Sequence, residues 1–98
     1  MAELALAFRR KAEADLDDIL TFSVTRFGPE VAAAYTAGLI SACEKLRDFP
    51  EMASIVPTIR RPTRCLIHRS HRIFYRLEPE RILIVRILHQ SRATPTAL

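Results

Sequence analysis

The sequence is poor in the residues that build cofactor sites. It has only two glycines, Gly28 and Gly38, which excludes a glycine-rich loop that cradles phosphates. Its two cysteines, Cys43 and Cys65, are too few for a disulfide framework, and we expect both to stay reduced. The histidines lack a nearby acidic second shell, so they give only a weak metal signal. We therefore expect neither a cofactor nor a metal.

Long apolar runs and targeting signals are also missing. No stretch approaches the roughly 18 apolar residues that span a bilayer. The N-terminal residues MAELALAFRRK place their charges after a very short apolar stretch, the reverse of a secretory signal. We expect one cytoplasmic domain spanning residues 1–98, with no membrane partner and with a flexible tail at residues 91–98.

The two parts of the chain carry opposite charge. Residues 1–59 hold six Lys/Arg and nine Asp/Glu, a net charge of −3, whereas residues 60–98 hold nine Arg and two Glu, a net charge of +7. Arginine presents a planar fork of donors that suits phosphate or carboxylate groups. The basic part is either a solvated face or a binding surface for an acidic partner, which can be a polyanion or an acidic peptide.

Hydrophobic periodicity predicts a strand followed by two helices. Within residues 3–8, the large Leu4, Leu6 and Phe8 alternate with the small Ala5 and Ala7, as in a half-buried strand. An inward helical stripe follows, made by Leu16, Ile19, Leu20, Ser23 and Phe27. Gly28 ends this helix and Pro29 begins a second one, which ends before Pro50. The short connection predicts an antiparallel helical hairpin whose many small residues allow close packing.

The second part of the chain predicts strands. A short edge strand near Ile55 precedes strands at Cys65–His68, at residues 71–77 and at residues 82–89. In the last of these, one face carries Leu83, Val85, Ile87 and His89, and the opposite face carries Ile82, Ile84, Arg86 and Leu88. Both faces are largely apolar, which predicts a central strand. Arg86 must therefore reach a rim, a partner or an acidic side chain. The predicted fold is α+β, with the hairpin packed on a small antiparallel sheet.

The candidate functional residues are the arginines and histidines of this predicted sheet. Arginines can stabilise phosphorane-like charge while a histidine moves a proton, as in metal-free RNA cleavage. The same set also suits docking onto nucleic acid or an acidic protein. The binding candidates are Arg64, Arg69, Arg72, Arg76, Arg86 and His89.

The ordered set of motifs resembles a known family. The residues Ala14-Asp15-Leu16, Phe27-Gly28, Ala34-Tyr35, and the segments HRIFYR at 71–76 and IVRILH at 84–89 are similar to the ParE branch of the RelE/ParE superfamily of bacterial toxins. This resemblance covers nearly the whole chain. It implies a growth-arresting toxin that is neutralised by a cognate ParD-like antitoxin with an acidic C-terminal segment.

The resemblance leaves two activities open. ParE-like members are associated with inhibition of DNA gyrase, and RelE-like members with ribosome-dependent cleavage of mRNA. In the ribonuclease reading, Arg72 and Arg86 would stabilise charge and His89 would act as the acid. Gln90 stands where some ribonucleases have a catalytic tyrosine, and residues 51–63 offer no convincing lysine or glutamate base. The sequence thus favours gyrase inhibition. The third hypothesis is a decayed toxin that only binds its antitoxin.

Overall fold

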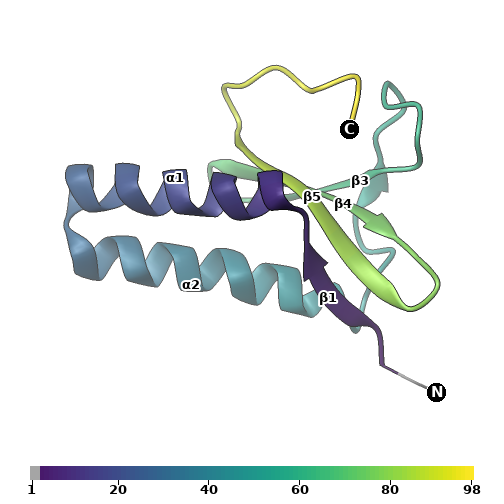
Figure 1. Cartoon of the computed structure of the whole chain (residues 1–98), viewed down its shortest axis with the longest axis horizontal. Helices are drawn as coiled ribbons and strands as arrows, with labels where there is room; N and C mark the ends of the chain where they lie inside the picture. The colour runs from purple at the N-terminus through teal and green to yellow at the C-terminus, as the bar shows by residue number, and fades with distance from the viewer. Residues whose placement is uncertain (1–2) are drawn as a thin grey trace.

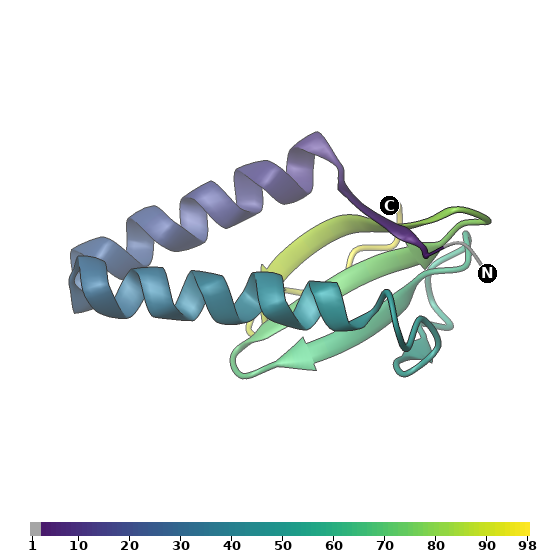
Figure 2. The ribbon, with the colours of Figure 1, turned by 90° about the horizontal axis from the view of Figure 1, so that it is seen from below.

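The computed structural model describes residues 3–98 and shows a helical hairpin on one face of a five-stranded sheet (Figures 1 and 2). The elements in chain order are β1 (Ala5–Phe8), α1 (Arg10–Phe27), α2 (Pro29–Lys45), β2 (Ser54–Ile55), β3 (Arg64–His68), β4 (His71–Leu77) and β5 (Arg81–His89). The strand order across the sheet is β1-β5-β4-β3-β2. The predicted α+β fold is therefore confirmed.

One strand pairing differs from the prediction of an antiparallel sheet. β1 lies parallel to β5, with Ala5 opposite Arg81 and Phe8 opposite Ile84, whereas the other pairs are antiparallel. The sheet is thus mixed. A parallel pair needs a long crossover connection, and the whole hairpin with β2 to β4 supplies one. Because β1 covers the edge of β5, β5 is an interior strand, as its apolar faces predict.

The hairpin forms where the sequence predicts it. Gly28 has a φ of 89° and its N–H donates to the carbonyl of Val24 at 2.9 Å, which closes α1. Pro29 is the first residue of α2 and needs no N–H partner there. α2 ends at Lys45, earlier than the predicted limit at Pro50.

A bulge in β5 changes which side chains face the helices. Phe74 pairs with Arg86 but Tyr75 pairs with Ile84, so Val85 is an extra residue in β5. The strict alternation predicted for residues 82–89 is therefore wrong beyond Val85. Ile82, Ile84 and Ile87 all join the core under the helices, which also contains Leu39, Cys43, Leu46, Ile73 and Tyr75. An extra residue in a strand reverses the face to which the following side chains point, and the bulge at Val85 has this effect here.

The far end of the hairpin extends past the sheet (Figure 2). The predicted inward stripe of α1 is buried near the sheet, where Leu16 and Ile19 pack on the core. Farther along the same stripe, Leu20 is 38% exposed and Phe27 is 58% exposed. The prediction that these two are core residues is wrong, because no strand lies beneath them.

The opposite face of the sheet is covered by loops and by the tail. Phe74, Leu83, Val85 and Leu88 form a second apolar cluster there with Ile59, and Leu98 packs against it. After β5 the chain turns back across the molecule toward the β2–β3 side (Figure 1). Residues 91–98, which the sequence suggests are flexible, thus have a defined path, and their mobility stays a prediction. Within residues 3–98, neither helix is long and apolar enough to cross a bilayer.

Candidate functional site

An apolar groove lies at the tip of the hairpin, and we call it the tip groove. It has a volume of about 730 Å³. Its walls come from α1, α2, the β3–β4 turn and the end of β5. The lining residues are Asp15, Asp18, Ile19, Phe22, Ser23, Phe27, Val31, Tyr35, Ser70, His71, Ile87, Leu88, His89, Ser91 and Arg92.

The apolar walls of the tip groove are unusually open to water. Phe22, Phe27 and Val31 are 62%, 58% and 55% exposed. Grouped exposed apolar side chains on a small protein mark a surface that binds another protein. The tip groove therefore offers an apolar bed for a partner segment. Two of the small residues of α2 face inward instead: Ala32 is buried, and a Cβ atom added to Gly38 would lie 3.4 Å from Nε2 of His68.

A cluster of aromatic and histidine rings closes the sheet end of the tip groove. The hydroxyl of Tyr35 on α2 hydrogen-bonds Nδ1 of His71 at 2.6 Å and Oγ of Ser70 at 3.1 Å. The ring of His71 contacts the ring of His89 edge-on, with centroids 5.4 Å apart. The ring of Tyr35 also lies 6.1 Å from that of His68. The three histidines thus do come together, around a tyrosine that fixes one of them.

Hydrogen bonds and burial define the protonation of this cluster. The Ser91 N–H donates to Nδ1 of His89 at 3.1 Å, so neutral His89 carries its proton on Nε2. Burial lowers the pKa of His71, and the charges of His89 and His68 lower it further. His71 is therefore neutral at pH 7. Within residues 3–98, no group of three metal-binding side chains is placed to hold an ion.

Arg86 is bound inside the fold. Its Nε and Nη2 donate to the two carboxylate oxygens of Asp15 on α1, at 2.8 and 2.9 Å. The same carboxylate accepts the N–H of Ile87 at 2.9 Å. Hydrogen bonding to the Asp15 carboxylate raises the pKa of Arg86. Of the three outcomes that the sequence leaves open for Arg86, the structure shows an acidic side chain, Asp15. The pair joins α1 to β5 just after the bulge.

The other predicted arginines lie in different places. Arg64 donates to the carbonyl of Ala53 at 2.7 Å, and Arg69 is exposed in the β3–β4 turn with a φ of 51°. Arg72 and Arg76 lie on β4, on the face opposite the helices, where both bond the tail. The structure therefore places Arg72 and Arg76 on one face of β4 and His89 against His71, but it does not gather the six predicted residues into one surface.

Sequence reasoning missed the features that define the tip groove. Tyr35 lies in the predicted second helix, and a polar aromatic residue there, able to face a strand that ends in histidines, is a usable signal. Periodicity alone does not show that Asp15 of α1 reaches Arg86. The exposure of Phe22 and Val31 depends on how far the hairpin extends past the sheet, and no local pattern carries that information.

Comparisons with known proteins agree with each other. A family model described as the ParE toxin of the type II toxin–antitoxin system parDE matches residues 6–94. Toxin ParE1 of Caulobacter vibrioides is 42% identical over 82 residues, which cover 84% of each chain. A chain from the chromosomal ParDE system of P. aeruginosa has a TM-score of 0.77 and 27% identity, covering 89% of this chain and 96% of that one. The RelBE2 toxin–antitoxin complex of Mycobacterium tuberculosis supports the fold alone, with a TM-score of 0.62 at 20% identity over 94% of this chain and 97% of that one.

Proposed function

Because the chain belongs to the ParE toxin family and is the toxin of a type II ParDE toxin–antitoxin system, we propose that it arrests growth by binding and inhibiting DNA gyrase. A cognate ParD-like antitoxin neutralises it by laying an amphipathic segment in the tip groove. Family membership supports the class of target. The choice of binding over catalysis rests on one observation, which is the separation of the residues that an RNA-cleaving site would need.

The three residues that the ribonuclease hypothesis needs, Arg72, Arg86 and His89, do not point to one place. His71 and His89 pair in register and contact each other on the helix side of the sheet. Arg72 follows His71 in β4 and so points to the opposite face, where it bonds the tail. Arg86 is held by Asp15. A site that stabilises a developing negative charge needs its donors aimed at one point, and this arrangement favours a binding toxin.

The tip groove supports the antitoxin part of the proposal. An amphipathic helix docks its apolar face by residues at positions i, i+3, i+4 and i+7. Phe22, Phe27 and Val31 present the matching apolar bed. His89 and Arg92 line the same groove near the sheet and can meet acidic residues at the edge of such a helix. A disordered acidic segment that folds on binding fits this surface.

The gyrase proposal is tested with purified toxin and gyrase. We expect the toxin to block supercoiling of relaxed plasmid and to stabilise cleaved DNA, and prior addition of the antitoxin to prevent both. Normal supercoiling without stabilised breaks, with toxin in excess over gyrase, would refute this target. The ribonuclease alternative predicts cut messages on translating ribosomes and loss of cutting in His89→Gln, so intact mRNA with unchanged toxicity of that variant would exclude it. Normal growth under strong expression without antitoxin would instead favour the decayed toxin.

Matched variants test the tip groove. Val31→Asp places a charge in the groove, and we expect it to weaken antitoxin binding roughly 10- to 100-fold, the range of a buried interface anchor. Ile67→Asp is the control, since Ile67 is 71% exposed on β3 and is not a groove residue. Titration calorimetry measures both affinities, with the unfolding midpoint checked for each variant. Equal affinities of the two variants would place the antitoxin elsewhere.

A further inference from the structure

Three histidines form a row across the sheet, on the face that the helices cover. His68 of β3 pairs in register with His71 of β4, and His71 pairs in register with His89 of β5. The ring centroids of His71 and His89 are 5.4 Å apart. The ring of Tyr35 on α2 lies beside the row, with its centroid 6.1 Å from that of His68 and 5.5 Å from that of His71. His71 and His89 line the sheet end of the tip groove.

Contacts within the fold hold the two inner histidines of this row. Nδ1 of His71 shares a 2.6 Å hydrogen bond with the Tyr35 hydroxyl, and His71 is 9% exposed. His68 is half-buried, and its Nε2 lies 3.4 Å from the position of a Cβ atom added to Gly38. His68 is also not a residue of the groove wall. His89 is therefore the member of the row that a partner in the groove reaches most readily.

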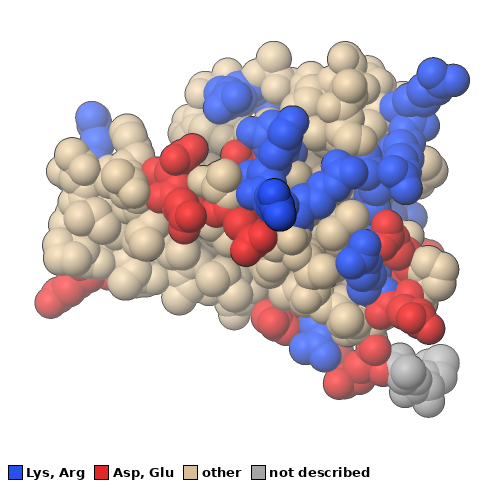
Figure 3. All heavy atoms as spheres, viewed as in Figure 1, with Lys and Arg blue, Asp and Glu red and all other residues tan. Residues whose placement is uncertain are grey.

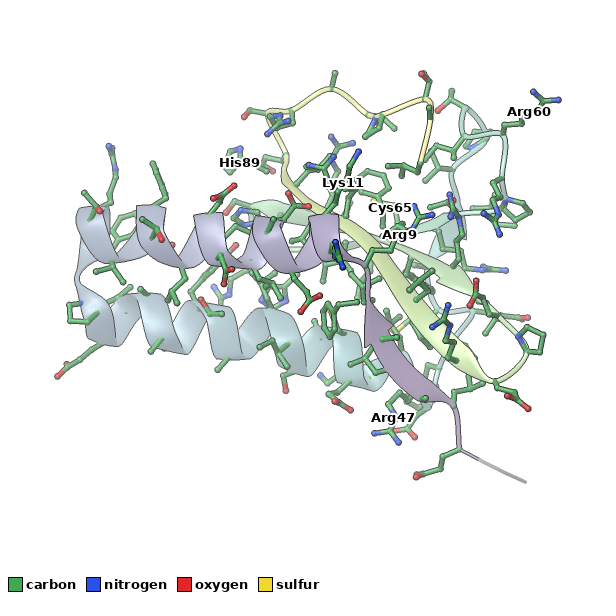
Figure 4. The ribbon with its side chains drawn as sticks, viewed as in Figure 1. Arg9, Lys11, Arg47, Arg60, Cys65 and His89 are labelled. Carbon is green, nitrogen blue, oxygen red and sulfur yellow. The ribbon has the colours of Figure 1, made fainter. Side chains whose placement is uncertain are left out.

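His89 can gain a proton without losing its contact to the protein. It is exposed and lies where β5 runs into the tail (Figure 4). Its Nδ1 accepts the Ser91 N–H at 3.1 Å and lies 2.8 Å from Ser91 Oγ. A hydroxyl can accept as well as donate, so Ser91 Oγ can accept a proton that is added at Nδ1. Nε2 of His89 makes no hydrogen bond within residues 3–98 and stays available to a ligand.

Within residues 3–98, the fold supplies no ion-pair partner for any histidine of the row. Asp15 and Asp18 line the groove from α1, but the Asp15 carboxylate accepts its hydrogen bonds from Arg86. Tyr35 is the titratable group that α2 contributes, and Arg92 lines the groove from the tail. Acidic side chains gather over the middle of α1, and basic side chains lie on the side of the tail (Figure 3). The sheet end of the groove thus lacks a bound negative charge.

The histidines of the row oppose each other's protonation. Burial lowers the pKa of His71, and the charges of His89 and His68 lower it further. A negative charge within about 4–6 Å has the opposite effect, because it favours the protonated form of an imidazole. An acidic group that docks beside the row therefore favours protonation of the histidine that it contacts.

We propose that His89 binds a carboxylate of the antitoxin at the sheet end of the tip groove and takes up a proton from solvent as it does so. The proton adds to Nδ1, which then donates to Ser91 Oγ, while Nε2–H donates to a carboxylate oxygen. Arg92 adds a fixed positive charge to the same wall. This site rests on the proposed antitoxin groove and deepens it. It names an Asp or Glu side chain as the group that is recognised, and it makes neutralisation of the toxin tighter as pH falls.

The size of this effect follows from the titration of an imidazole. An opposite charge raises an imidazole pKa by about one unit from its ordinary value near 6.5. Binding at pH 7 should therefore take up roughly half a proton, and the affinity should be roughly fivefold higher at pH 6 than at pH 8. Carboxylic side chains titrate near pH 4, so they do not produce a change in this range.

Isothermal titration calorimetry of the full-length toxin with its cognate antitoxin measures the proton uptake. Titrations at pH 7 in phosphate and in Tris, whose ionisation enthalpies differ, give the number of protons from the difference in binding enthalpy. We expect His89→Gln to abolish both the uptake and the dependence of affinity on pH. His68→Gln is the matched control, because His68 is not a groove residue, and it should keep both. Arg92→Gln should weaken binding by the same factor at pH 6 and pH 8. Circular dichroism establishes that each variant is folded.

Nuclear magnetic resonance follows the ring of His89 directly. We expect the midpoint of its titration to rise when the antitoxin is added to the unmodified toxin. An unchanged midpoint, a lack of proton uptake by the unmodified toxin, or the same uptake in His89→Gln would overturn this site. If Val31→Asp still weakens binding in that case, the antitoxin groove stands and the histidine inference alone fails. Equal affinities of Val31→Asp and Ile67→Asp would instead overturn the groove of the proposed function, and this site with it.

Discussion

The pair formed by Asp15 and Arg86 should be the most sensitive polar contact in the protein. The Asp15 carboxylate accepts three hydrogen bonds, two from Arg86 and one from the Ile87 N–H. The side chains of Arg86 and Asp15 are 21% and 11% exposed. Asp15→Ala therefore leaves a largely buried guanidinium and a buried N–H without their acceptor.

The expected cost follows from this burial. Removing one partner of a buried ion pair costs about 3–5 kcal/mol. Arg86 keeps some contact with water, so we expect about 3 kcal/mol for Asp15→Ala. A domain of this size has a stability of about 5–15 kcal/mol, and its melting temperature falls by about 4–8 °C per kcal/mol. The variant should therefore melt roughly 12–24 °C lower.

Urea unfolding followed by circular dichroism measures this cost, and a double-mutant cycle isolates the pair. Asp15→Ala, Arg86→Met and the double variant should give a coupling free energy of about 2 kcal/mol. Glu78→Ala is the control, since Glu78 also pairs with an arginine, Arg81, at 2.6 Å, but on an exposed turn, and we expect an unchanged midpoint. A coupling below about 0.5 kcal/mol would refute the idea that this pair fastens α1 to β5.

Three shorter predictions concern single residues. The pKa of His71 is lowered by burial and by His89 and His68, so as pH drops the unfolded chain protonates this histidine before the folded chain does. The free energy of unfolding should therefore fall as pH drops below about 6.5. Urea unfolding from pH 7 to pH 5 measures this fall, and an equal dependence on pH in His71→Gln would contradict the prediction. Burial raises the pKa of Cys43 to about 12, so in Cys65→Ser the native thiol should resist a disulfide reagent at pH 8, and rapid modification would argue against it. Gly28 has a φ of 89°, and a Cβ atom added there would meet no other atom. Gly28→Ala should therefore lower the free energy of unfolding by about 1 kcal/mol through backbone strain alone. An unchanged urea midpoint would show that the turn adapts.

The sequence predicted the features that depend on neighbouring residues. Gly28 and Pro29 mark a helix end and a helix start by their own backbone preferences, so the hairpin was predictable. Side chains alternate along a strand, so the strand predicted at residues 71–77 also puts Arg72 and Phe74 on one face. The apolar character of both faces of residues 82–89 correctly predicted an interior strand.

The remaining features depend on contacts between distant residues. The bulge at Val85 is invisible because both faces of β5 are apolar, so a phase shift leaves the pattern equally plausible. The tail contacts Arg72 and Arg76 largely through backbone oxygens, which no side-chain pattern encodes. The roles proposed for Arg64, Arg69, Arg72, Arg76, Arg86 and His89 in binding a partner stay predictions.

The pairing of β1 with β5 has a consequence for the order of folding. β1 begins at Ala5, yet its partner is the strand that starts at Arg81. Closing so long a loop carries a large entropic cost, and contacts between distant segments form slowly. The hairpin needs only local contacts and can form first on the emerging chain. On the ribosome, the helical hairpin can therefore form before the sheet closes. The tip groove is complete only afterwards, because its walls include the β3–β4 turn and the end of β5.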